Sequence, residues 1–102
     1  MQPRLTVFWV YILLCENNTF YTGYTTDIKK RYQAHINRTS QCKYTRSFKP
    51  LRIAQCWKIN GDKAFAMKIE AYIKNLSRIE KEGIIDNPSL LLMDSRIEIA
   101  IL

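Results

Sequence analysis

The 102-residue sequence is poor in the residues from which proteins build zinc sites and disulfide frameworks. It has one histidine, His35, and three cysteines, Cys15, Cys42 and Cys56, which are widely spaced and form no Cys-x-x-Cys motif. Common zinc sites need four such ligands at short spacings, and disulfide-rich folds need an even set of cysteines. The sequence therefore argues against both, and we expect reduced, partly buried thiols in the cytoplasm.

Long apolar runs and low-complexity tracts are also missing. Residues 5–15 are apolar, but a helix needs about 20 such residues to cross a bilayer. Leu14 stands where a lipoprotein signal would carry a small residue before Cys15. We therefore expect a cytoplasmic domain with no membrane partner. This domain would comprise residues 1–88, with residues 89–102 as an apolar tail of unknown role that packs on the same domain.

Acidic residues are scarce in one stretch of the chain only. Between Asp27 and Arg52 there are eight basic residues and one acidic residue, which account for the whole net charge of +7. The basic residues are Lys29, Lys30, Arg31, Arg38, Lys43, Arg46, Lys49 and Arg52. A basic segment on an otherwise neutral chain predicts a surface for a polyanion. The alternative is a solvated positive face without a partner.

The hydrophobic pattern predicts an α/β domain of the α+β kind. Both alternating faces of residues 7–15 are apolar, which indicates a strand that is covered on both sides. Turn residues and a second strand at 20–24 would complete a hairpin. The further predicted elements are a helix over 28–37 with Asp27 as its N-cap, a strand over 51–59, a helix over 63–76 capped after a break at 60–62, and a short helix from Ser77 to near Gly83. This order predicts a small, mostly antiparallel sheet with helices packed on it.

Six residues of this layout could form a site for phosphodiester chemistry. They come from the hairpin, from one margin of the first helix and from the flank of the second: Tyr11, Tyr21, Gly23, Arg31, His35 and Glu70. Phosphodiester cleavage needs a base for water and positive charge near the phosphate, which arginine and a metal ion supply. One carboxylate can hold Mg²⁺, because this ion keeps several of its waters.

Each of these residues also has a plainer interpretation. The two tyrosines can be sheet residues with hydroxyls at the rim, and Gly23 can mark a bulge. The Arg31 and His35 side chains can form an exposed helix edge. Glu70 can pair with Lys74, which lies four residues further on in the favourable order. The pattern of residue types alone leaves both interpretations open.

The ordered set of motifs resembles the GIY-YIG nuclease family. The set consists of Trp9-Val10-Tyr11, Tyr21-Thr22-Gly23, Arg31, His35 and Glu70. The first motif departs from the family pattern, because Trp-Val-Tyr replaces Gly-Ile-Tyr. Residues 43–46 and 70–81 resemble the small stand-alone bacterial branch of the family, and the resemblance covers about residues 7–85.

The resemblance implies a three-stranded antiparallel sheet flanked by helices and a one-metal site. Glu70 would hold Mg²⁺ or Mn²⁺, Tyr11 would act as the general base, and Tyr21 would help to place the nucleophile or the phosphate. Arg31 would stabilise charge in the transition state, and His35 would orient a tyrosine or exchange protons with it. The residues implied to contact nucleic acid are Gly23, Lys43, Arg46, Lys74 and Arg78. Many family members carry a supporting asparagine, for which Asn75 and Asn87 are both available.

The function expected from this resemblance is a metal-dependent DNA endonuclease of repair or recombination. DNA is favoured over RNA, and cleavage would follow the structure of the substrate or a partner protein more than its sequence. The alternative is a non-catalytic nucleic-acid-binding module with the same fold. A third hypothesis, a protein-interaction role, rests on the apolar tail. The oligomeric state stays open.

Overall fold

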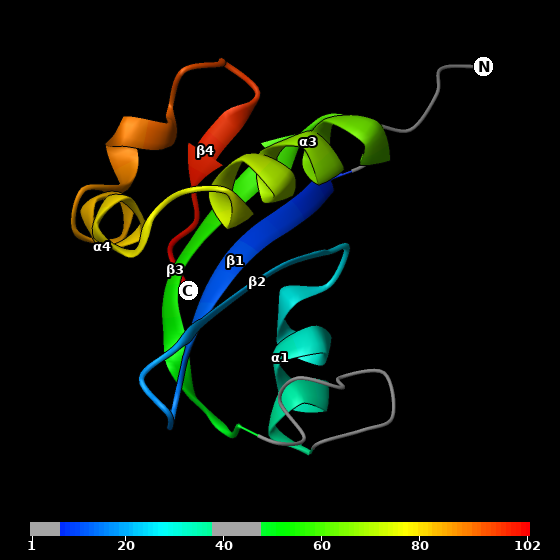
Figure 1. Ribbon diagram of the computed structural model, residues 1–102. Helices are drawn as coiled ribbons and strands as arrows, with labels where there is room; N and C mark the ends of the chain where they lie inside the picture. The colour runs from blue at the N-terminus through cyan, green and yellow to red at the C-terminus, as the bar shows by residue number, and fades with distance from the viewer. Residues whose placement is uncertain (1–6, 38–47) are drawn as a thin grey trace.

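The computed structural model describes residues 7–37 and 48–102, which form an antiparallel sheet with helices on both faces (Figure 1). The four strands lie in the order β2-β1-β3-β4. The elements are β1 (Val7–Cys15), β2 (Phe20–Thr25), α1 (Ile28–Ile36), β3 (Pro50–Asn60), α3 (Lys63–Lys74), α4 (Arg78–Asp86), the 3₁₀ turn η1 (Pro88–Leu91) and β4 (Ile97–Ile99). The α+β class is confirmed. No helix within these two ranges is long and apolar enough to span a membrane.

The expected number of strands was wrong, because the apolar tail adds a fourth strand to the sheet. β4 pairs with residues Trp57 to Ile59 of β3. Leu91 and Ile97 are buried in the same core as Trp57, whose indole N–H donates to the carbonyl oxygen of Pro88 at 3.0 Å. The tail therefore buries apolar side chains that the three-stranded sheet alone would leave exposed.

β1 lies between β2 and β3 in the sheet and is covered on both faces, as its pattern predicted. Val10 and Ile12 enter the core beneath α3 and α4, whereas Tyr11 and Leu13 enter the smaller core beneath α1. The turn between β1 and β2 places Asn18 at a φ of 60°, a conformation that asparagine tolerates better than most residues. The hairpin register that results sets Tyr11 opposite Gly23.

Side-chain caps begin all three helices, as the sequence predicted for two aspartates and a serine. Asp27 accepts the backbone N–H of the third helical residue of α1 at 3.1 Å, and Asp62 does the same for α3 at 2.8 Å. Ser77 and Glu80 form a reciprocal capping box at the start of α4. α4 continues past Gly83, where we expected its end, because this glycine does not adopt the positive φ of a helix terminus.

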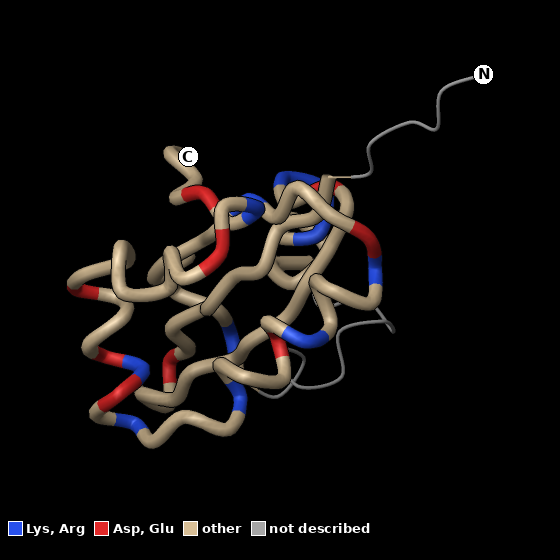
Figure 2. The backbone as a smooth tube through the Cα atoms, turned by 90° about the horizontal axis from the view of Figure 1, so that it is seen from above, with Lys and Arg blue, Asp and Glu red and all other residues tan. Residues whose placement is uncertain are grey.

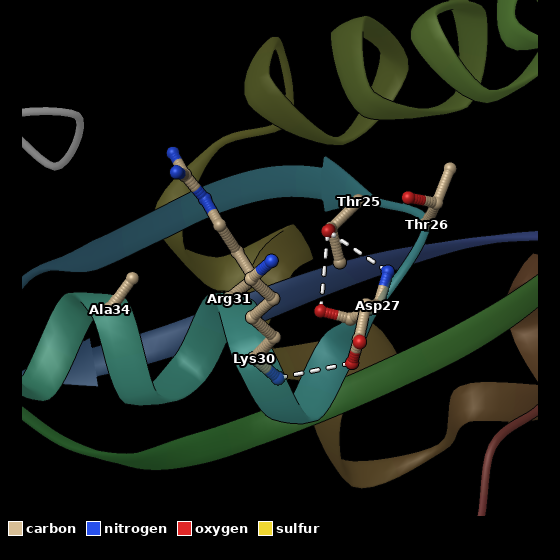
Figure 3. A pocket seen from close by; sticks show the side chains of 6 residues that line it. All are labelled: Thr25, Thr26, Asp27, Lys30, Arg31 and Ala34. Atoms are coloured by element: carbon tan, nitrogen blue, oxygen red, sulfur yellow. Dashed lines mark hydrogen bonds between the residues drawn. The ribbon is translucent and has the colours of Figure 1, made fainter.

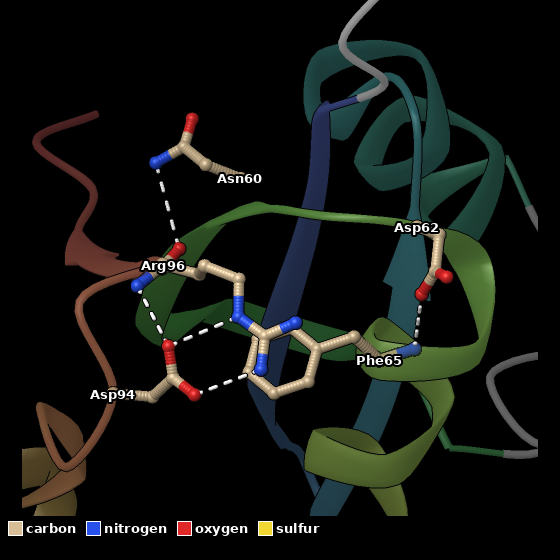
Figure 4. A network of polar contacts seen from close by, with 5 residues as sticks. All are labelled: Asn60, Asp62, Phe65, Asp94 and Arg96. Atoms are coloured by element: carbon tan, nitrogen blue, oxygen red, sulfur yellow. Dashed lines mark hydrogen bonds and ion pairs between the residues drawn. The ribbon is translucent and has the colours of Figure 1, made fainter.

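A network of polar contacts attaches the tail to the start of α3 (Figure 4). The guanidinium of Arg96 makes two hydrogen bonds to the carboxylate of Asp94 and lies 3.6 Å from the centre of the Phe65 ring. The side chain of Asn60 donates to the carbonyl oxygen of Arg96. These contacts hold the Phe65 side of α3 towards β4, so the opposite side of the helix faces the edge strand β2.

Candidate active site

Three of the predicted site residues meet between β1 and α1. The phenol oxygen of Tyr11 lies 2.9 Å from His35 Nε2, and Arg31 Nε donates to the same oxygen at 3.4 Å. Tyr11 projects from the middle of β1, and the two helix residues lie one turn apart on α1. The phenol oxygen therefore lies between an imidazole and a guanidinium.

Tyr21 and Gly23 lie beside this cluster on β2. The ring of Tyr21 contacts the His35 ring edge-on, with 5.1 Å between the ring centres, and tilts against the Tyr11 ring at 6.4 Å. Gly23 is buried, and a Cβ atom added to it would stand 2.6 Å from the Tyr11 phenol oxygen. The Tyr11 ring thus occupies the space beside Gly23, and the contact of Gly23 with nucleic acid stays a prediction.

His35 is fully buried, which the expected position on a helix margin did not predict. Burial, and to a smaller extent the neighbouring Arg31 charge, lower the pKa of His35 from 6.5 to about 4. The imidazole is consequently neutral at pH 7. A neutral imidazole has one nitrogen that accepts a proton and one that donates. His35 can therefore exchange a proton with the Tyr11 phenol without carrying a permanent charge.

Glu70 lies on α3, on the opposite face of the sheet from α1. About 140° around the helix separates Glu70 from Phe65, and α3 packs across β1 and β2. Glu70 accordingly stands on the side of α3 that faces the edge strand β2. Its carboxylate forms an ion pair with Lys74 at 3.0 Å, and 16% of its side chain is exposed. The rival interpretation of Glu70, the surface pair, is therefore present in the structure.

The metal-binding capacity of the described residues rests on single carboxylates. Within residues 7–37 and 48–102, no group of three or more His, Cys, Asp or Glu side chains could hold an ion together. A hydrated Mg²⁺ needs only one or two protein carboxylates, since waters and substrate oxygens fill its other positions. The partly exposed carboxylate of Glu70 fits such an ion once the Lys74 ammonium moves away from it and the ion pair is broken.

The remaining predicted residues lie at helix ends or outside the described residues. Lys43 and Arg46, like Cys42, fall in the latter group, whereas Cys15 and Cys56 are buried free thiols. Asn75 ends α3, and Asn87 ends α4 and accepts a hydrogen bond from Ser89. Both asparagines therefore serve helix termini, and neither can be assigned as the supporting residue of the site.

Arg78 is held by the β1–β2 hairpin. Its guanidinium donates to the carbonyl and side-chain oxygens of Asn18, lies 4.2 Å from the Phe20 ring centre and pairs with Glu82. Acidic and basic residues alternate along α4 (Figure 2), so this helix adds no net positive surface. The contact of Arg78 with nucleic acid stays a prediction, and the structure assigns this residue a packing role.

The sequence interpretation did not single out a cavity that adjoins Arg31 (Figure 3). The cavity has a volume of about 420 Å³ and lies at the junction of β2 and α1. It is lined by Thr25, Thr26, Asp27, Lys30, Arg31 and Ala34. In the sequence, Lys30 is one of the eight basic residues between Asp27 and Arg52. The available signal was its position next to Arg31, because neighbouring residues of a helix project only about 100° apart.

Three comparisons place the chain among known proteins. Residues 7–82 match the family described as GIY-YIG catalytic domain. A UPF0213 protein of Halalkalibacterium halodurans is 40% identical over 77 residues, which cover 76% of this chain and 80% of that protein. A UPF0213 protein of Syntrophus aciditrophicus is 40% identical over 81 residues, or 78% of this chain and 92% of that protein. The solution NMR structure of a UPF0213 protein from Bacillus halodurans is similar with a TM-score of 0.51 and 38% identity, and the match covers 79% of this chain and 84% of that one.

Proposed function

This chain belongs to the GIY-YIG catalytic-domain family, and from that membership we propose that it is a metal-dependent endonuclease that hydrolyses DNA. The observation that carries the proposal is the position of the Tyr11 phenol oxygen, 2.9 Å from a neutral imidazole and 3.4 Å from the Arg31 guanidinium. A buried tyrosine hydroxyl needs at least one hydrogen-bond partner for its stability alone. A tyrosine that gives up and regains a proton needs in addition a proton acceptor and a positive charge beside its oxygen, and Tyr11 has both.

Tyr11 and His35 would move the protons of the reaction, and Arg31 would stabilise the negative charge. Tyr11 accepts a proton from the attacking water as the new bond to phosphorus forms, and in the same step it passes its own phenol proton to His35 Nε2, 2.9 Å away. Arg31 favours the negative charge that develops on the phenol oxygen. The bond from phosphorus to the leaving oxygen breaks and that oxygen takes a proton from solvent, while His35, whose lowered pKa makes it a weak base, gives its extra proton back to solvent. Tyr21, packed on His35, helps to position the water or the phosphate.

Glu70 would hold the divalent ion, because GIY-YIG nucleases generally use such ions and the Glu70 carboxylate fits a hydrated one. For the bound ion to supply positive charge to the phosphate in the transition state, the substrate would have to lie across the β2 edge, because Glu70 and Tyr11 stand on opposite faces of the sheet. Lys74 would have to turn from the carboxylate, and its ammonium could then contact a phosphate of the backbone.

The substrate class follows from the same family membership, which implies nucleic acid. We favour DNA in a repair or recombination intermediate over RNA. The described residues form one sheet with its helices and carry no separate module for reading bases. Contacts to the phosphate backbone would therefore recognise the shape of the substrate, and any sequence choice would come from a partner protein.

One observation favours the alternative of a binding module that does not cut. The Glu70–Lys74 ion pair is what an ordinary helix surface shows, and a pure binder needs no metal ligand at this position. The two functions differ in one measurable respect. Both bind nucleic acid in a salt-dependent way, but only the endonuclease breaks the strand when Mg²⁺ or Mn²⁺ is present.

The deciding experiment compares two matched glutamate variants. Purified protein is incubated with supercoiled plasmid, a four-way DNA junction and a structured RNA, with Mg²⁺, Mn²⁺ or EDTA. Glu70→Gln should abolish metal-dependent cutting and keep DNA binding. Glu82→Gln, which also removes one half of an i, i+4 ion pair on a helix, should cut like the wild type. Wild-type protein that binds these substrates and never cuts them, or Glu70→Gln that cuts normally, would contradict the proposal.

A further inference from the structure

The cavity beside Arg31 has the composition of an anion site (Figure 3). Lys30 and Arg31 both extend from α1 towards the edge strand β2, and they bring two positive charges to a space of about 420 Å³. The only acidic residue of the lining is Asp27, whose Oδ1 accepts the backbone N–H of Lys30 as the helix cap. The lining therefore carries a net positive charge.

The hydroxyl groups of the lining differ in what they can still bind. Thr25 Oγ1 donates to the carbonyl oxygen of Asp27 and accepts the backbone N–H of the same residue. Thr26 is exposed, and the described residues show no hydrogen bond of its hydroxyl. Lys30 is also exposed, and no ion pair of its ammonium is found within the described ranges. Thr26 and Lys30 are thus the groups able to bind a ligand here.

Arg31 connects this cavity with the candidate active site. Its Nε donates to the Tyr11 phenol oxygen, whereas its side chain forms part of the cavity lining. An anion in the cavity and a phosphate at Tyr11 would therefore be separated by about one arginine side chain. Successive phosphates of a nucleic-acid strand are neighbours on this scale.

From this geometry, and on the basis of the proposed nuclease function, we infer that the cavity binds a backbone phosphate adjacent to the one that is cut. Lys30 supplies the charge and Thr26 a hydroxyl donor. The contact would fix the register of the strand at Tyr11 without reading a base. Arg31 would serve both phosphates, whereas Lys30 would serve only the neighbouring one.

Lys29 provides a matched control on the same helix. It lies next to Lys30 in the sequence and is also exposed, but it lines a different cavity with Ile28, Tyr32 and Ile53. Replacing either lysine by glutamine removes one charge from α1 and leaves the buried side of the helix intact. A difference between the two variants therefore reports position and not net charge.

The first arm measures DNA binding by fluorescence anisotropy across a salt series, without metal, so that it does not depend on cleavage. A single phosphate contact contributes about 1 to the slope of log K against log salt. Lys30→Gln should lower the slope by about 1, and Lys29→Gln should leave it near the wild-type value. Equal slopes for the two variants would overturn the inference, even if the wild type proves to be an active nuclease.

The second arm replaces single phosphates of the DNA by uncharged methylphosphonates, one position at a time. One position should weaken binding to the wild type and to Lys29→Gln, and should weaken it less in Lys30→Gln, where only Arg31 and Thr26 still contact that phosphate. If the protein binds DNA but never cuts, the proposed function fails while both arms still decide this inference. A methylphosphonate effect of the same size in Lys30→Gln as in the wild type at every position would refute the Lys30 contact.

Discussion

Replacement of Gly23 by alanine tests how the Tyr11 ring is positioned. An added Cβ would stand 2.6 Å from the phenol oxygen and 2.8 Å from Cζ of Tyr11, closer than real Cβ atoms come to other atoms. Tyr11 is only 1% exposed, so its ring has no open space into which it could move. The ring must shift against its packed neighbours, or the two strands must separate at the pair Tyr11–Gly23.

The expected cost follows from two contributions. Overpacking of a filled core costs about 1–3 kcal/mol. A displaced phenol would also lose its 2.9 Å hydrogen bond to His35, which adds about 1 kcal/mol. Gly23→Ala should therefore lower the free energy of unfolding by about 2–4 kcal/mol, which corresponds to a fall in Tm of roughly 10 °C for a domain of this size.

Gly83→Ala is the matched control with the opposite sign. Gly83 lies inside α4, and an added Cβ would meet no atom within 4 Å. Alanine is a better helix former and restricts the unfolded chain, so this variant should gain about 0.5–1 kcal/mol. Urea titrations followed by the fluorescence of Trp9 and Trp57, together with thermal melts, measure both variants.

A Gly23→Ala variant whose free energy of unfolding lies within about 0.5 kcal/mol of the wild-type value would refute this account. The Tyr11 ring would then accommodate the added Cβ at no cost, and its close contact with Gly23 would not fix its position. Destabilisation of both variants by similar amounts would instead indicate a general intolerance of added volume. The described contact is supported only if the free energy of unfolding falls in Gly23→Ala and rises in Gly83→Ala.

Three further predictions concern pH, a helix cap and an arginine. The pKa of His35 falls from 6.5 in the unfolded chain to about 4 in the folded one. Its contribution to the free energy of unfolding is therefore complete above pH 6.5, and about 3 kcal/mol of it is lost as the pH falls towards 4. Urea titrations at several pH values should show this loss in the wild type and not in His35→Gln. Ser77→Ala removes the capping box and should cost about 1 kcal/mol in thermal melts, whereas Glu80→Gln should cost less, because glutamine also caps. Arg78→Ala loses the stacking on Phe20 and should cost about 0.5–1 kcal/mol. A lowered salt slope of DNA binding in this variant would support the predicted contact of Arg78 with nucleic acid, and an unchanged slope would contradict it.

The elements of the fold were predictable where their signals lie within a few residues. Asp27, Asp62 and Ser77 cap helices because a short polar side chain can reach a backbone N–H three residues ahead. β1 was predictable because its run of β-branched and aromatic residues is apolar on both faces. The fourth strand was not, because Ile97–Ile99 becomes a strand only by pairing with residues about 40 positions earlier.

For the candidate site, too, the sequence predicted some features and not others. The ordered residues from Tyr11 to Glu70 were enough to assign the family, since the order of motifs is a property of the chain, and the match over residues 7–82 confirms that assignment. The roles of the individual residues stay predictions. Their positions depend on how the sheet and the helices pack, which the motifs do not specify.

Periodicity and local residue signals predicted the helices, three of the strands and the caps, and the resemblance of the ordered motifs indicated the family. The folded chain was needed to place Tyr11 opposite Gly23 and against His35, to bury that histidine, and to put Glu70 on the other face of the sheet beside Lys74. The physical reason is that caps and alternation act between neighbours in the chain. Strand register, the face on which a helix packs and the cavity beside Arg31 depend on residues brought together from distant parts of the chain.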